Sequence, residues 1–240
     1  MRLKTLFFLC LAIVALSGCT RPINRAAERR IRDMLPTVIG QAKKYTAHID
    51  NAPEKTLAGK LSTVLIEGED VHFRNGLIMD NLKLELKGVE IDVDSKRLKK
   101  IRHTNFIITV GEANLNEYLV DEVLDGESLR NVRVKLNENS VTVIGQRVVL
   151  GLGVPFEISG PLKINGPTRI ELDTARMRVV GLPFTGKILD FVKRRITAAT
   201  DLDGFAFPMI ISEIRTGSGK LTLSGSANPM PLLDNDRPLW

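Results

Sequence analysis

Apolar and polar residues alternate with a period of two along most of the chain after residue 60. Leu82, Leu84 and Leu86, for example, are separated by Lys83 and Glu85. This alternation is typical of strands with one face buried and the other in water. It predicts strands over residues 62–68, 71–77, 82–86, 89–93, 106–110, 132–136, 141–143, 148–158, 162–164, 170–172, 177–179, 209–214 and 221–223. Short turns join most of these runs, which favours an antiparallel meander over parallel βαβ units.

The longest alternation covers residues 148–158 and predicts one continuous strand. Its apolar members are expected to share one face: Val148, Leu150, Leu152, Val154, Phe156 and Ile158. Gly151 and Gly153 fall on the opposite face. Glycines inside a strand indicate a bend, a bulge or a close approach of the backbone, so this strand is expected to be locally distorted.

Three segments change from the strand period to the helical spacing of three and four residues. The first covers residues 21–46, where Pro36 is expected to kink or split the helix. A polar loop follows over residues 48–59, and the other two helices cover residues 112–124 and 183–196. The predicted fold class is therefore α+β, with a long, strongly twisted antiparallel sheet wrapped around two or three helices.

The N-terminus has the pattern of a secretory signal over residues 1–18. Arg2 and Lys4 precede a nearly apolar stretch that is too short to span a bilayer. The following Leu16-Ser17-Gly18-Cys19 resembles the lipobox of bacterial lipoproteins, in which a diacylglyceryl group alkylates the cysteine. This resemblance predicts lipidation of Cys19 and a protein of the cell envelope, outside the cytoplasm. An ordinary signal peptide with a chance cysteine is the alternative.

The residue after the cysteine bears on which membrane would hold the protein. Thr20 stands where Asp would retain a lipoprotein at the inner membrane. The expected location is the periplasmic face of the outer membrane in a host with two membranes, and otherwise the outer face of the plasma membrane.

Charge changes this picture only near the predicted anchor. The net charge is +6 and aromatic residues make up 5% of the chain, which argues against nucleic acid as a partner. Five arginines crowd the segment that follows the cysteine: Arg21, Arg25, Arg29, Arg30 and Arg32. They are predicted to contact acidic headgroups of the membrane, at about 1 kcal/mol each, although a solvated helix face explains them equally well.

Candidate chemistry is sparse. Cys10 leaves with the signal and Cys19 carries the lipid, while the three histidines have no partner at metal-ligand spacing. The Gly-x-Ser-x-Gly elbow of lipases is also absent from the sequence. We therefore expect no catalytic residue, no metal and no cofactor.

Five short runs between residues 61 and 196 stand out: 74–82 (RNGLIMDNL), 112–119 (EANLNEYL), 144–145 (IG), 154–162 (VPFEISGPL) and 181–184 (GLPF). Together these runs resemble the LmeA-like phospholipid-binding family of bacterial envelope proteins. The resemblance implies a long curved sheet wrapped about helices, similar to one half of the tubular lipid-binding (TULIP) proteins. It also implies phospholipid bound between sheet and helix. The chain would then comprise an N-terminal helical segment over 19–50, a single lipid-binding domain over 51–225 and an irregular tail over 226–240.

Three functional hypotheses of different classes follow. In the first, a non-enzymatic lipoprotein binds phospholipid acyl chains in an apolar slot and assists lipid transport or envelope assembly. The residues expected to line the slot are Val148, Leu150, Leu152, Val154, Phe156, Ile158, Leu182, Phe184, Ile188 and Leu189. In the second, the protein is a scaffold or accessory partner of an envelope enzyme such as a glycosyltransferase. A lipid esterase is a third and less favoured hypothesis.

Overall fold

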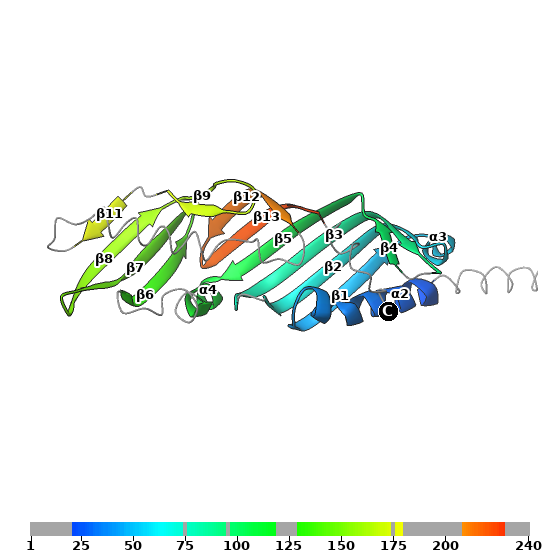
Figure 1. Cartoon of the computed structure of the whole chain (residues 1–240), viewed down its shortest axis with the longest axis horizontal. Coiled ribbons are helices and arrows are strands. Elements are labelled where there is room, and N and C mark those ends of the chain that lie inside the picture. The colour runs from blue at the N-terminus through cyan, green and yellow to red at the C-terminus, as the bar shows by residue number, and fades with distance from the viewer. Residues whose placement is uncertain are drawn as a thin grey trace, which may run out of the picture.

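The protein is an elongated molecule built mostly of antiparallel strands (Figure 1). A computed structural model describes residues 21–73, 76–94, 97–118, 129–173, 176–179 and 208–228. Within these residues the α+β class, with a large antiparallel sheet and few helices, is confirmed. The helix predicted over residues 183–196 lies outside the described residues, as do residues 229–240 of the predicted tail.

The larger of the sheets has seven strands in the order β1-β2-β3-β5-β13-β12, with β4 paired to β3. Their bounds are β1 Ala42–Asp50, β2 Lys60–His72, β3 Ile78–Asp92, β4 Arg97–Lys100, β5 His103–Gly111, β12 Met209–Gly217 and β13 Lys220–Ala227. The first strands form a meander, as expected from their short connections. The hairpin of β12 and β13 then returns from far along the chain and pairs β13 with β5.

A second sheet of four strands has the order β11-β8-β7-β6 and occupies the other end of the molecule (Figure 1). Its strands are β6 Leu129–Asn137, β7 Ser140–Val149, β8 Leu152–Gly160 and β11 Arg176–Val179, and a separate pair is formed by β9 Leu162–Ile164 and β10 Ile170–Leu172. The predicted single sheet is thus divided. Backbone hydrogen bonds connect the parts, such as Ile211 N to Pro167 O at 2.7 Å.

Three helices are described: α2 Arg21–Val38, α3 Pro53–Leu57 and α4 Glu112–Tyr118. The predicted helix over 21–46 is correct only as far as Val38, and Pro36 lies inside it without splitting it. Gly40 then adopts a φ of +147°, and a Cβ there would meet His72 O at 2.2 Å. The chain reverses at this glycine and continues as β1, whose buried Tyr45 and Ile49 fit the strand period.

The predicted strands near the start of the sheet are longer than expected. Run 62–68 lies within the single strand β2, which takes in only the first two residues of run 71–77, so the strand predicted over 71–77 is wrong beyond His72. Runs 82–86 and 89–93 belong largely to the single strand β3. The apolar alternation of β3 changes phase near Gly88, which has a φ of +63°. β2 changes phase at the same place, so the cross-strand pairs remain apolar: Val64 with Leu86 and Leu61 with Val89. The loop predicted over residues 48–59 also contains the end of β1 and the short helix α3.

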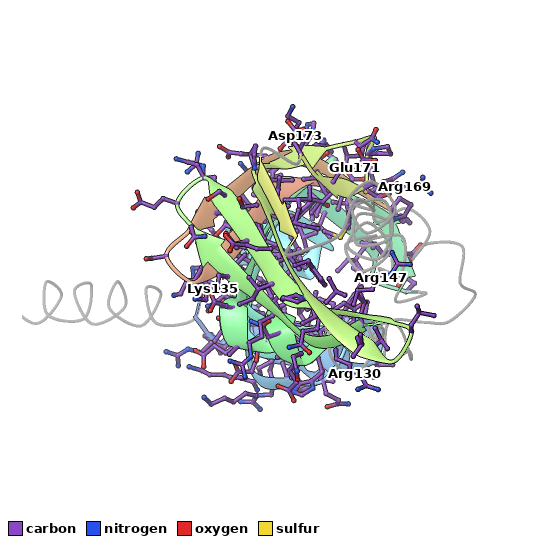
Figure 2. The ribbon with its side chains drawn as sticks, turned by 90° about the vertical axis from the view of Figure 1, so that its left-hand side faces the viewer. Arg130, Lys135, Arg147, Arg169, Glu171 and Asp173 are labelled. Carbon is purple, nitrogen blue, oxygen red and sulfur yellow. The ribbon has the colours of Figure 1, made fainter. Side chains whose placement is uncertain are left out.

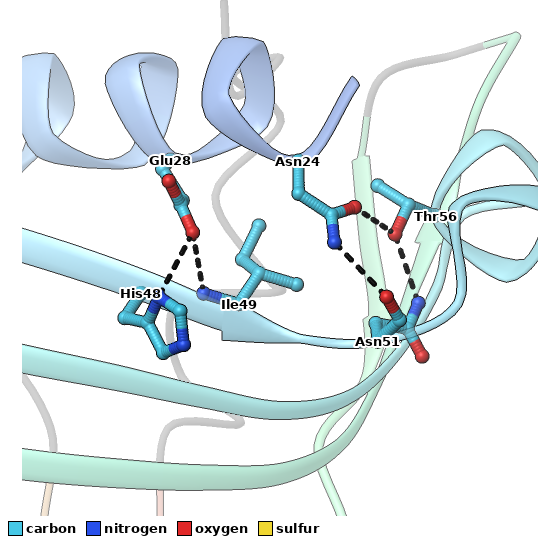
Figure 3. Close-up of polar contacts among 6 residues, drawn as sticks. All are labelled: Asn24, Glu28, His48, Ile49, Asn51 and Thr56. Carbon is cyan, nitrogen blue, oxygen red and sulfur yellow. Dashed lines mark hydrogen bonds and ion pairs between the residues drawn. The ribbon is translucent and has the colours of Figure 1, made fainter. Parts of the chain in front are cut away.

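Helix α2 lies along the edge strand β1 and is held there by polar contacts (Figure 3). Glu28 Oε1 accepts a hydrogen bond from Ile49 N at 2.9 Å and forms an ion pair with His48 Nδ1 at 3.2 Å. Asn24 donates to Asn51 O at 2.9 Å and accepts from the Thr56 hydroxyl at 2.8 Å. The helix therefore satisfies backbone groups that an edge strand would otherwise expose.

Replacing Glu28 with alanine should lower the free energy of unfolding by about 1–3 kcal/mol, because the Ile49 N–H loses its acceptor in a partly buried position. Urea denaturation of the two proteins measures the change. His48→Ala is the matched control, since it removes only the exposed ion pair and should cost below about 1 kcal/mol. An equal loss in both variants would show that the ion pair, and not the backbone contact, docks the helix.

Candidate functional site

The buried face of the large sheet, called here the inner face, carries rows of apolar side chains that cross the strands. In these rows the residues are direct register partners: Ala47, Ile66, Leu84, Phe106 and Gly225 in one, and Tyr45, Gly68, Leu82, Ile108 and Leu223 in the next. Phe106, Ile108 and Leu82 are almost fully buried. The sheet therefore presents a continuous hydrocarbon surface to the interior.

Three aromatic residues lie directly opposite a glycine on the neighbouring strand. The pairs are Tyr45 with Gly68, Phe106 with Gly225 and Phe156 with Gly145. A Cβ on any of these glycines would lie 2.8 or 2.9 Å from the ring of its partner. The missing side chains let each ring pack across the adjacent strand, an arrangement suited to a strongly twisted sheet.

The second sheet continues the apolar interior. On β7 and β8 the inner-face partners are Val143 with Ile158 and Gly145 with Phe156. Buried residues of both sheets belong to one connected hydrophobic cluster. Viewed along the long axis, the strands curve around an interior into which side chains project (Figure 2). The apolar interior thus extends through both sheets.

Helix α4 joins the two sheets through side-chain hydrogen bonds to the edge strand β6. The Asn116 side chain makes two hydrogen bonds to the backbone of Val134: its Oδ1 accepts from Val134 N at 2.6 Å, and its Nδ2 donates to Val134 O at 2.8 Å. Glu112 Oε2 accepts from Leu136 N at 2.8 Å. On its other side, Asn114 donates to Asp80 of β3 at 2.7 Å. These side chains take the place of a neighbouring strand. Together with the backbone hydrogen bonds from Gly219 N to Leu136 O and from Asn139 N to Thr216 O, they join the two sheets.

The structure separates the residues predicted to line the slot. The expected continuous strand over 148–158 is wrong, because the chain turns at Leu150 and Gly151, with φ values of 52° and 82°. Phe156 and Ile158 are buried on the inner face, and the half-buried Val154 shares that face through its register partner Arg147.

The remaining described members of the set are not buried with them. Val148 pairs with Gly153 and therefore lies on the opposite face, and Leu150 is exposed in the turn. Leu152 alternates to the same side of β8 as Val154, but it is exposed at the hairpin. The error has a physical cause: an apolar turn continues the alternation across two strands. The other predicted members, Leu182, Phe184, Ile188 and Leu189, lie outside the described residues.

The predicted membrane-contact arginines all lie on α2. Arg25, Arg29, Arg30 and Arg32 are exposed on the helix, whose apolar residues Ile31 and Leu35 pack against the core. Cys19 and the side chain of Arg21 lie outside the described part of the chain. The exposed arginines therefore occupy the face of α2 that is directed away from the sheet.

Electrostatic perturbations among the described residues are few. Burial raises the pKa of Tyr45 to about 12, so its neutral hydroxyl donates to Gly40 O at 2.8 Å. No group of three or more His, Cys, Asp or Glu side chains in these ranges is placed to hold a metal ion. None of the helices that the structure describes combines the length and apolarity needed to cross a bilayer.

Sequence reasoning missed two features of this site. The inner-face residues Leu82, Leu84, Phe106 and Ile108 were visible as strand alternation, but nothing local shows that their strands lie side by side. Asn116 was named in the sequence only as part of the run 112–119 that resembles the family, and no role was predicted for it. The signal that could have pointed to it is the cluster of amides and carboxylates in a short amphipathic helix, since such side chains bind exposed backbone groups.

Comparison with protein families gives the class of protein that this fold defines. The model of the LmeA-like phospholipid-binding family matches residues 17–226. The chain therefore belongs to this family, and membership implies that it binds phospholipid. The family is not a known catalytic one. No curated protein and no solved structure matched the chain in the corresponding searches.

Proposed function

We propose that the protein is an envelope lipoprotein that holds phospholipid acyl chains against the inner face of its sheets and assists lipid transport or envelope assembly. The observation that carries this proposal is the continuous apolar interior through both sheets in a chain of the phospholipid-binding family. Each acyl methylene removed from water stabilises the complex by about 0.8 kcal/mol before ordering costs, so a long chain is a suitable ligand.

Val154, Phe156 and Ile158 are the described residues of the original set that would contact the acyl chains. All three share the inner face of β8, which continues the surface formed by the large sheet. Leu182, Phe184, Ile188 and Leu189 would supply contacts from the later segment. Val148 is excluded from the proposed site by its position on the opposite face.

Anchoring would place this interior beside a membrane. A lipid on Cys19 would lie two residues before α2, whose exposed arginines would rest on acidic headgroups. Two or more acyl chains hold a protein stably at a bilayer, so a diacylglyceryl anchor is sufficient for attachment. The matching test is metabolic labelling with palmitate: Cys19→Ser should abolish incorporation and release the protein from the membrane fraction.

The experiment that tests lipid binding uses the soluble protein from Thr20 to Trp240, which retains every described element. Its organic extract should contain phospholipid by mass spectrometry, and the emptied protein should take up labelled phospholipid. Val154→Asn should weaken uptake about tenfold, because a polar amide would lie against hydrocarbon.

Val148→Asn is the matched control for this variant, being the same substitution at a half-buried valine of the opposite face. It should bind lipid like the parent. Absence of lipid from the extract together with absence of uptake would contradict the proposal. Co-purification of an envelope protein in that case would favour the scaffold function instead.

A further inference from the structure

The hairpin between β7 and β8 ends in an exposed apolar tip, defined here as residues 150–153. These four residues, Leu-Gly-Leu-Gly, carry no charged and no polar side chain. Leu150 is 99% exposed and Leu152 is 73% exposed, the largest exposures among the big apolar residues that the structure describes. Transfer of both leucine side chains out of water would be energetically favourable.

Leucine is also a poor choice for the backbone at this turn. Positive φ at both central residues defines the two-residue hairpin turn that strongly prefers Asn-Gly. The other described non-glycine residues with positive φ are Asp70, Asn131 and Asn139, all short and polar. An asparagine at position 150 would therefore suit both the backbone and the solvent better, so the fold does not explain Leu150.

Two arginines lie behind the tip, Arg147 on β7 and Arg130 on the adjacent edge strand β6 (Figure 2). Arg147 is the register partner of Val154 and of Leu129. Arg130 is the register partner of Gln146, the residue before Arg147 on β7. Because successive residues of a strand point to opposite faces, the two arginines lie on opposite faces of the sheet. Residues 139–156 contain no acidic side chain. Because a strand advances about 3.3 Å per residue, Arg147 lies about 10 Å behind Leu150.

This spacing fits the boundary between hydrocarbon and headgroups. Apolar side chains of interfacial proteins reach roughly 5–10 Å into that boundary, which would place the two guanidinium groups at the level of the phosphates. Arginine matches phosphate in geometry as well as in charge. A bilayer with anionic lipids therefore suits both the leucines and the arginines, whereas an apolar protein pocket would suit only the leucines.

We propose that the tip is a second membrane-binding site, which inserts Leu150 and Leu152 into a phospholipid bilayer while Arg147 and Arg130 contact headgroup phosphates. The tip lies at the end of the molecule opposite α2 (Figure 1). It would therefore bind a membrane independently of the proposed anchor and of lipid held in the interior. The exposure of the two leucines and the positions of the two arginines support this site without either of those proposals.

Sedimentation with vesicles of phosphatidylcholine and phosphatidylglycerol tests the site in the soluble protein from Thr20 to Trp240. The double variant Leu150→Asn/Leu152→Thr should bind about tenfold more weakly, because two apolar contacts are lost while the turn gains its preferred residue. Ile210→Thr is the matched control, since it removes an exposed apolar side chain on β12 that is 54% exposed, and it should bind like the parent. Equal binding of parent and double variant would overturn the proposal.

A fluorescent reporter distinguishes insertion from other contacts. The chain has one tryptophan, Trp240, so Leu150→Trp in a Trp240→Phe background reports on the tip alone. Its emission should shift to the blue on addition of the vesicles and should be quenched by lipids brominated in their acyl chains. Binding without this shift, or a shift that depends on protein concentration and not on vesicles, would assign the tip to another partner and overturn the proposal.

The same variants separate this site from the acyl-chain site. Phospholipid extracted from the Leu150→Asn/Leu152→Thr protein should match the amount extracted from the parent, since both leucines are exposed at the hairpin and neither is part of the buried interior. Vesicle binding by Val154→Asn should likewise persist. Loss of vesicle binding in the tip variant with retained lipid would support the tip alone, and the reverse pattern would contradict it.

Discussion

Replacing Phe106 with alanine should lower the free energy of unfolding by about 3–5 kcal/mol. Phe106 is 1% exposed at the centre of the inner face, where its register partners are Leu84 on β3 and Gly225 on β13. Glycine has no side chain to move into the space that the ring would vacate. The resulting cavity would weaken the pairing of β13 with β5, which joins the end of the chain to the sheet. Chemical denaturation measures the loss.

The adjacent residue supplies the matched control. Ile107 is on the same strand but faces outward and is 45% exposed. Ile107→Ala should cost below about 1 kcal/mol, because it leaves little new cavity and changes mainly strand propensity. Similar losses for the two variants would mean that Phe106 is not packed as the structure has it.

Replacing Asn116 with alanine should cost about 2–4 kcal/mol, because it leaves the N–H and the C=O of Val134 without their partners in a partly buried joint. The Asn116 amide also donates to Glu112 O within α4 at 2.8 Å, but alanine is the better helix former and offsets the loss of that bond. Hydrogen exchange should show the largest effect on β6. The free energy of unfolding comes from urea denaturation.

Two variants on the same helix make the test of Asn116 specific. Asn116→Asp retains the acceptor for Val134 N but loses the donor, so an intermediate loss is expected. Glu117→Ala changes an exposed neighbour and should be nearly neutral. If Asn116→Ala were as stable as Glu117→Ala, the hydrogen bonds of Asn116 would add nothing to the joint, and the backbone bonds such as Gly219 N to Leu136 O would hold the sheets together.

Local patterns predict a strand well where one face is buried and the other is wet. Phe106 and Ile108 on β5, and Val134 and Leu136 on β6, were identified in this way. The spacing of apolar residues fails as a guide where a helix and a strand would both fit it. Tyr45 satisfies both the helical spacing of α2 and the alternation of β1, and only the reversal at Gly40 decides between them.

The candidate site was predictable in kind but not in its membership. Phe156 and Ile158 were correctly expected on an apolar face, although their contact with lipid stays a prediction. The turn at Leu150 was missed because it lacks the polar residues that usually mark a hairpin. The pairing of β13 with β5 joins distant segments, and no local spacing of residues contains that information.

The position of α2 over β1 has a consequence for the behaviour of shortened forms of the protein. An edge strand that is covered by a helix cannot pair with a strand of a second molecule, whereas an uncovered edge strand is a template for intermolecular pairing. A form of the protein that begins after Val38 would expose the edge strand β1, together with the apolar surface that Ile31 and Leu35 cover. It should therefore self-associate more than the parent, and α2 would serve as the cap that blocks this route of association.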